Sequence, residues 1–264
     1  MKTCLLLFTL LGIFLACGAF TDAEEITFAS MEWEGYVNAD GTGLYAEMLK
    51  LIYAPAGFKL TFQIVPWARA IKMVVNHDAD ALIGDSDTAP VPELLHSAYP
   101  LDFDDVHYLA RKSQPYTDQN SFRGKTIGWI KGYGFDKKIA LPKGTYAIYE
   151  VPETLTGIRM IKKGHLDFFI DYEEIIKSEA EKDQIDLGDC QLIAGFEERF
   201  LMGFANTEKG KRLLQIYDDR IKALYQSGEL RTFWQTAGVE TGRIDQKRVE
   251  QILRIVQQEL NAGK

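Results

Sequence analysis

Aromatic and charged side chains follow the predicted strands of this chain at the points where the strands end. In an open α/β sheet, ligands bind outside the carboxyl ends of the strands, where loops and helix N-termini converge. Aromatic walls with a few polar groups are typical of a pocket for a small molecule. The residues at these positions, and therefore the predicted ligand-binding residues, are Glu32, Trp33, Tyr36, Trp67, Arg69, Asp85, Trp129, Lys131, Tyr133, Asp171 and Tyr172.

For several of these residues a structural role also fits the sequence. Trp33 and Trp129 could be half-buried core residues, since a single aromatic side chain can serve either purpose. Asp85 and Asp171 could cap helix N-termini, which is the commonest use of an aspartate after a strand. Their shared position at strand ends favours the pocket but leaves the core and the caps open.

Two cations stand where an anion is expected nearby. Arg69 falls in the first turn of a predicted helix, where the helix dipole disfavours a positive charge. The compensating anion is either a ligand carboxylate or a protein carboxylate such as Asp85 or Glu47, and ion pairs within the protein are slightly favoured. Lys131 precedes Gly132-Tyr133-Gly134, a glycine-rich helix start whose backbone N–H groups could hold an anion.

Sequence patterns of the common catalytic and metal sites are missing from the chain. Its four histidines are scattered without the spacing of metal ligands, and no P-loop, dinucleotide-binding or nucleophile-elbow motif occurs. We therefore expect no metal, no cofactor and no catalysis. In an enzyme, Glu32, Glu173 or Asp171 would be the candidate general acid, and each would need a raised pKa.

Composition is that of a globular protein with an acidic balance. The 264 residues include 30 Lys and Arg against 38 Asp and Glu, which gives a formal net charge of -8, and 46% are hydrophobic. A negative surface repels a phosphate backbone, so nucleic acid is not an expected partner.

Residues 1–19 have the pattern of a secretory signal peptide. A lysine precedes a short apolar run, and small residues follow it. Because the apolar run is too short to span a membrane, we expect cleavage after Ala19 and export to the periplasm. Cleavage before Cys17, with lipid anchoring of that cysteine, is the less favoured alternative.

Short apolar runs alternate with longer amphipathic stretches from residue 25 onward. This alternation predicts β–α units around a mostly parallel sheet. The predicted strands are 25–30, 59–65, 80–84, 104–112, 125–130, 145–151, 167–171, 190–195 and 199–205. The predicted helices are 43–56, 66–76, 132–139, 153–163, 172–182, 207–227 and 245–261.

One helix–turn–strand pattern occurs twice. Residues 71–74 and 80–85 line up with residues 158–161 and 167–171 at an offset of 87 residues, and each copy ends in an aspartate. Such a repeat predicts two similar α/β lobes.

The remainder of the chain after the second copy must pack on one of these lobes. Its return to the first lobe would give two crossings, near residues 110–113 and 195–200, and a cleft between hinged lobes. The predicted lobes are residues 24–112 with 197–264, and residues 113–196.

Six segments, in their order and spacing, resemble the extracellular solute-binding proteins of family 3, which serve polar amino-acid ABC transporters. The resemblance covers about residues 26–238. Its segments are Gly43-Leu44-Tyr45-Ala46-Glu47-Met48-Leu49, Pro66-Trp67-Ala68-Arg69-Ala70, Asp80-Ala81-Leu82-Ile83, Ser97-Ala98-Tyr99-Pro100, Phe122-Arg123-Gly124-Lys125-Thr126-Ile127-Gly128 and Gly164-His165-Leu166-Asp167-Phe168.

This resemblance implies a two-lobed type II periplasmic binding fold that closes over a small polar ligand, an amino acid or a related metabolite, and delivers it to a membrane permease. It also implies that Asp171 is the partner of a ligand ammonium. Members typically carry an arginine soon after the third strand of the first lobe, where it clamps the ligand carboxylate. Residues 88–93 contain no arginine, so that role would fall to Arg69.

The Trp67-x-Arg69 opening resembles a divergent branch of the family. Two alternatives to transport follow from relatives with the same fold. One is a ligand-sensing partner of a membrane receptor, and the other is an enzyme that resembles dehydratases or lytic transglycosylases.

Overall fold

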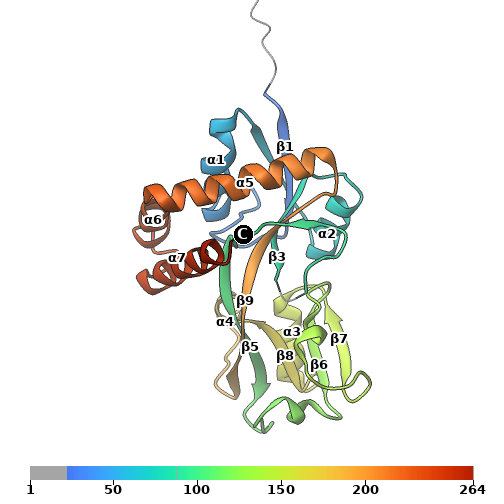
Figure 1. Ribbon diagram of the computed structural model, residues 1–264. Coiled ribbons are helices and arrows are strands. Elements are labelled where there is room, and N and C mark those ends of the chain that lie inside the picture. Colours follow the sequence, from blue (N-terminus) through green and yellow to red (C-terminus); the bar gives the residue numbers. More distant parts are fainter. Residues whose placement is uncertain (1–22, 88, 264) are drawn as a thin grey trace, which may run out of the picture.

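The computed structural model describes residues 23–87 and 89–263, so the predicted signal peptide and Cys17 lie outside the described residues. Its strands form a nine-stranded sheet in the order β2-β1-β3-β9-β5-β8-β6-β7, with β4 paired to β9. Figure 1 shows two bodies joined by the long strands β5 and β9. The strands are β1 (Glu25–Ser30), β2 (Lys59–Ile64), β3 (Ala81–Ser86), β4 (Leu95–His96), β5 (Asp102–Arg111), β6 (Thr126–Ile130), β7 (Ala147–Val151), β8 (Phe168–Tyr172) and β9 (Cys190–Phe204).

Helices cover both bodies. The α-helices are α1 (Leu44–Tyr53), α2 (Trp67–Val75), α3 (Thr154–Lys163), α4 (Glu173–Lys182), α5 (Glu208–Ser227), α6 (Glu229–Phe233) and α7 (Gln246–Asn261). Short 3₁₀ turns are η1 (Ala54–Ala56), η2 (Gln119–Phe122) and η3 (Phe135–Lys138), and η4 (Trp234–Val239) is π-helical.

Most predicted elements lie within two residues of the observed ones, but three predictions are wrong. The predicted helix 132–139 is only the 3₁₀ turn η3, because Gly132 and Gly134 both have positive φ angles. The predicted strands 190–195 and 199–205 are one strand, β9. In addition, the short strand β4 and α6 with η4 were not predicted at all.

The sheet is mixed, which corrects the prediction of a mostly parallel one. Within each body the pairs are parallel, β1 with β2 and β3, and β6 with β7 and β8. Where the bodies meet, β5 and β9 are antiparallel to each other, and each is antiparallel to the neighbouring strand of one body. The reason is topological: β5 carries the chain out of the first body and β9 carries it back beside β5.

The change from one body to the other takes place inside these two strands. In β5, residues 106–109 already pair with β8 of the second body. In β9, residues 200–204 pair with β3 of the first body. We call β1–β4, α1, α2 and α5–α7 lobe 1, and β6–β8, α3 and α4 lobe 2. The residue boundaries 112/113 and 196/197 stay predictions.

The duplicated sequence pattern has the same structural role in both lobes. The carboxylate of Asp80 accepts a hydrogen bond from the Thr27 N–H at 2.8 Å, and that of Asp167 accepts one from the Thr126 N–H at 2.9 Å. Each aspartate thereby ties the start of its own strand to the first strand of its lobe. This shared contact supports the interpretation of two similar halves.

Helix α7 packs on lobe 1 through an apolar stripe and a buried ion pair. The stripe residues Val249, Ile252 and Val256 are buried. Arg248 donates to both oxygens of Asp102, from Nε at 3.2 Å and from Nη2 at 3.0 Å. Asp102 is 1% exposed and also accepts the hydroxyl hydrogen of Tyr45. The tail beyond residue 241 is therefore an integral part of lobe 1.

Replacement of Arg248 by methionine should cost about 3–5 kcal/mol in the free energy of unfolding, because it leaves the buried Asp102 carboxylate without its counter-charge. Urea denaturation measures this loss. The matched control is Arg231→Met, which breaks a half-exposed bridge to Glu250 and should cost less than about 1 kcal/mol. Equal losses in the two variants would contradict the anchoring role of Arg248.

Candidate ligand-binding site

A cavity lies between the two lobes, beside the strands that connect them. The free space inside it has room for about one water molecule. Both lobes and β9 contribute side chains, most of them aromatic or small. The lining residues are Met31, Trp33, Trp67, Gly84, Asp85, Ser86, Ala89, Gly132, Tyr133, Phe135, Tyr172 and Glu198.

The wall from lobe 1 depends on a bulge in β3. The register of β3 against β9 shifts between Ile83 and Asp85, and Gly84 has a φ angle of +85°. A Cβ atom on Gly84 would lie 3.0 Å from the Trp33 ring, so a side chain at this position would press against the indole. The bulge thus makes room for Trp33 and presents Asp85 and Ser86 to the cavity.

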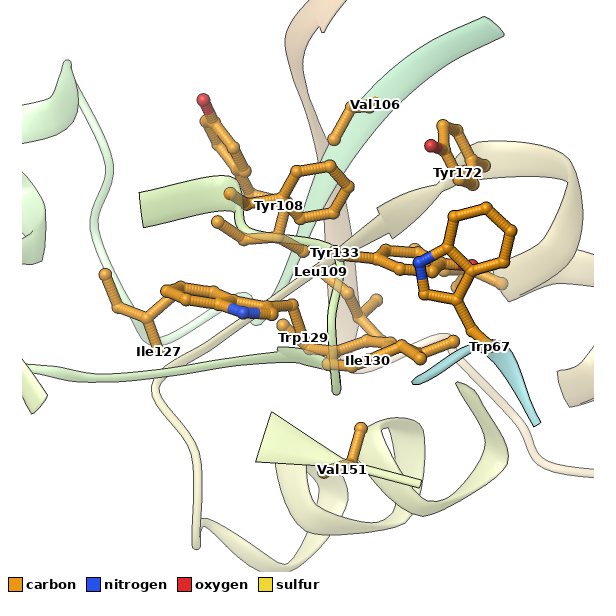
Figure 2. Close-up of a cluster of buried hydrophobic side chains, with 14 of the residues drawn as sticks. Trp67, Val106, Tyr108, Leu109, Ile127, Trp129, Ile130, Tyr133, Val151 and Tyr172 are labelled. Carbon is orange, nitrogen blue, oxygen red and sulfur yellow. The ribbon is translucent and has the colours of Figure 1, made fainter. Parts of the chain in front are cut away.

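Aromatic rings from the two lobes meet across the cavity. Trp67, at the start of α2, lies edge-on to Tyr133 of lobe 2, with ring centres 6.3 Å apart. Figure 2 shows Trp67 beside Tyr133, with Tyr172 above them. The Tyr133 hydroxyl also reaches Met31 Sδ of lobe 1 at 3.5 Å. The lobes are therefore in contact across the cleft in this conformation.

Glu198 joins the two lobes in the lining of the cavity. This residue of β9 is 0% exposed, and its carboxylate accepts hydrogen bonds from the Ser86 hydroxyl of lobe 1 and from the Tyr172 hydroxyl of lobe 2, the latter at 2.5 Å. Burial raises the pKa of Glu198, and the two hydroxyl donors partly oppose that shift. The sequence analysis did not single out Glu198, because it fell between two predicted strands.

The Asp85 carboxylate lines the cavity, but its oxygens already have hydrogen-bond partners within lobe 1. It lies 2.7 Å from His96 Nε2 and accepts hydrogen bonds from the N–H groups of Ser86 and Val91. These contacts fix the loop after β3.

Asp171 lies next to the cavity without lining it. It is fully buried, and its carboxylate accepts hydrogen bonds from the Thr154 hydroxyl at 2.6 Å and from the Tyr172 N–H at 2.9 Å. Burial raises the pKa of Asp171 to about 7, although both hydrogen bonds act to lower it. Its position at the start of α4 and beside the start of α3 is structural. A contact with a ligand ammonium stays a prediction.

Five of the predicted residues therefore line one cavity, namely Trp33, Trp67, Asp85, Tyr133 and Tyr172. Glu32 and Tyr36 line a separate hollow between lobe 1 and α4. Trp129 is 2% exposed and belongs to the core of lobe 2, where Figure 2 shows it on the far side of Tyr133 from Trp67. Of the two roles that the sequence left open for Trp129, pocket or core, the structure shows the core.

The two cationic residues that were predicted to bind an anion lie on the surface. Arg69 and Lys131 are exposed and do not line the cavity. The expected pairing of Arg69 with Asp85 or Glu47 is wrong, since Asp85 contacts His96 and Glu47 contacts Arg243. Within residues 23–87 and 89–263 no ion pair of Arg69 is formed, so the first turn of α2 tolerates this charge through exposure to solvent.

The three suggested catalytic acids have different environments. Glu32 is exposed, and a hydrogen bond from Lys177 lowers the pKa of Glu173. Asp171 has a raised pKa but no exposed surface. Among the described residues, no cluster of three or more metal-ligating side chains occurs.

Comparison with models of known families and with curated protein sequences finds no match. Solved structures do match. A histidine kinase sensor domain with similarity to periplasmic binding proteins is 14% identical, with a TM-score of 0.69 over 83% of this chain and 98% of that one. The glutamate-bound GluR0 ligand-binding core from Nostoc punctiforme is 12% identical, with a TM-score of 0.64 over 81% and 99% of the two chains.

A third similar structure is a substrate-binding protein of an ABC uptake transporter from Streptococcus pneumoniae with bound histidine. It is 16% identical, with a TM-score of 0.63 over 81% of this chain and 92% of that one. These likenesses confirm the predicted fold: the chain has the two-lobed type II periplasmic binding fold. In the part of the chain that the structure describes, no helix is long and apolar enough to cross a membrane.

The buried Asp171 should make the stability of the protein depend on pH. Its folded-state pKa of about 7 lies above the unfolded value of about 3.9, so its contribution is complete below pH 4 and is lost as the pH rises through 7. Relative to Asp171→Asn, which cannot titrate, the wild-type free energy of unfolding should fall by up to about 4 kcal/mol from pH 4 to pH 8.

Chemical denaturation at several pH values measures this difference. In Thr154→Val the loss should still begin near pH 4 but extend to higher pH and become larger, because the hydroxyl that favours the Asp171 carboxylate is gone. Parallel pH curves for the wild type and Asp171→Asn would show that Asp171 is not protonated in the folded state.

Proposed function

We propose that the protein is a solute-binding protein that captures a small polar molecule between its lobes and hands it on unchanged to a membrane transporter. The observation that supports this function best is the cavity at the lobe boundary, with Glu198 bound to one hydroxyl from each lobe. Solved structures with this fold include substrate-binding proteins of ABC transporters. Export to the periplasm, as the first 19 residues predict, would place the protein beside such a transporter.

Ligand capture would act by shifting the balance between open and closed lobes. The contacts between the lobes include the meeting of Trp67 with Tyr133 and an exposed ion pair between Glu34 and Lys182. A ligand that touches both walls stabilises the closed state by its difference in affinity for the two states. Because the present space takes about one water, the lobes must separate before a ligand enters.

A second candidate function is ligand sensing in partnership with a membrane receptor. The observation that favours it is the likeness to a histidine kinase sensor domain, which this chain covers over 98% of that domain's length. In-cell crosslinking followed by identification of the membrane partner separates the two functions. A permease as the partner supports transport, and a sensor kinase supports signalling.

Ligand binding should depend on Tyr133 and not on an exposed tyrosine of the same lobe. A panel of amino acids, amines, polyamines and organic acids is screened for an increase in melting temperature, and native mass spectrometry searches for a retained metabolite. A compound at 100 times its Kd stabilises the folded protein by about 2.7 kcal/mol. Tyr133→Ala should weaken its binding at least tenfold, since the ring contacts both Trp67 and Tyr172.

The matched control is Tyr149→Ala on β7, whose ring is 50% exposed and does not line the cavity. Each variant is compared with its own ligand-free melting temperature. The proposal fails if no compound stabilises the wild type and no metabolite is retained, or if the bound compound is converted on long incubation.

A further inference from the structure

The ionisable residues with charged side chains that line the cavity are both acidic. Its lining includes the carboxylates of Asp85 and Glu198 and, among the described residues, no lysine, arginine or histidine. Arg69 and Lys131, the two cations among the predicted ligand-binding residues, are exposed and lie outside the lining. A ligand carboxylate in this cavity would therefore meet like charges and no cationic clamp.

The two carboxylates differ in what they already bind. Asp85 has His96 at 2.7 Å and two backbone N–H donors. Glu198 accepts hydrogen bonds from two neutral hydroxyls. In the described part of the chain it forms no ion pair, and the charge of Lys138, which lies over the Phe196 ring, only partly opposes the rise of its pKa. A fully buried carboxylate without a directly paired cation is costly, and a cationic ligand would supply that pairing.

The walls around Glu198 suit the same kind of ligand. The rings of Trp33, Tyr172, Tyr133 and Trp67 form a continuous series, with successive centres 6.1, 5.9 and 6.3 Å apart. The faces of indole and phenol rings attract organic cations, most strongly in sites shielded from water.

We propose that the ligand is a small organic cation without a carboxylate, a protonated or quaternary amine, bound by the aromatic rings with Glu198 as its counter-ion. This inference rests on the proposed function, because it names the class of solute that the cleft captures. It separates this chain from the structures with the same fold that hold bound amino acids.

Calorimetric titration of the full protein with matched compounds tests the charge requirement. The cations are choline, tetramethylammonium, ethanolamine and putrescine. The comparison compounds are 3,3-dimethylbutan-1-ol, which has the shape of choline without its charge, glycine betaine, which adds a carboxylate, and the amino acids. The best cation should bind at least tenfold more tightly than every comparison compound.

Two glutamine variants test the role of Glu198. Glu198→Gln keeps the size of the side chain and removes its charge, and it should weaken binding of the best cation at least tenfold. Glu197→Gln changes the preceding residue, which is exposed and bonded to Gln251, and should leave the Kd within twofold of wild type. Should Glu198→Gln not fold, the wild-type comparison between choline and its neutral isostere still decides the charge requirement.

The outcomes separate this inference from the proposed function. An amino acid, or the neutral isostere, that binds as tightly as the best cation overturns the cationic class and leaves solute binding intact. Equal affinities of wild type and Glu198→Gln for the best cation overturn the role of Glu198. If no compound binds and no metabolite is retained, both proposals fail.

Discussion

The antiparallel ladder between β5 and β9 is the constraint on which the rest of the structure depends. Among the described residues, this is the pair of strands that both lobes share, and its register runs from Asp102 with Phe200 to Arg111 with Cys190. Because the pairing shifts near Val106, the ladder has a local irregularity where the chain passes from one lobe to the other. Any rearrangement of the lobes must bend these two strands. The cavity lies beside this point, and Glu198 of β9 is one of its walls.

Buried carboxylates are concentrated around this ladder, and each is satisfied in a different way. Asp102 has a guanidinium, Asp85 has an imidazole, and Asp171 has a hydroxyl together with a raised pKa. Glu198 has hydroxyls from opposite lobes. Glu198 can accept both hydrogen bonds only when the two lobes are close. The hydrogen bonding of its carboxylate therefore depends on the relative position of the lobes.

Sequence patterns predicted most of the elements and part of the cavity. The elements came from periodicity and caps, and Trp33, Trp67, Asp85, Tyr133 and Tyr172 came from the rule that strand ends form sites. Trp129 also follows this rule, yet its side chain points into lobe 2, because alternate residues of a strand face opposite sides. The face of the sheet to which a side chain points cannot be predicted without the register of its strand.

Glu198 was missed for a related reason. It lies inside a 15-residue strand that the sequence breaks with Gly195 and two glutamates, a composition that indicates a loop. Pairing with β3 and β5 overrides that local preference. The ion pairs of Arg69 were also mispredicted, since the sequence does not show that the Arg69 side chain is exposed to solvent.

The position of α7 suits the attachment of a fluorescent probe. This helix grips β5 at Asp102, and its Arg248 borders a hollow of about 950 Å³ whose opposite side is formed by Glu174 of lobe 2. A fluorophore on the first turns of α7 would sit beside this hollow, outside the cavity lining. The start of the C-terminal helix thus offers an attachment point for an optical probe of the relative position of the lobes.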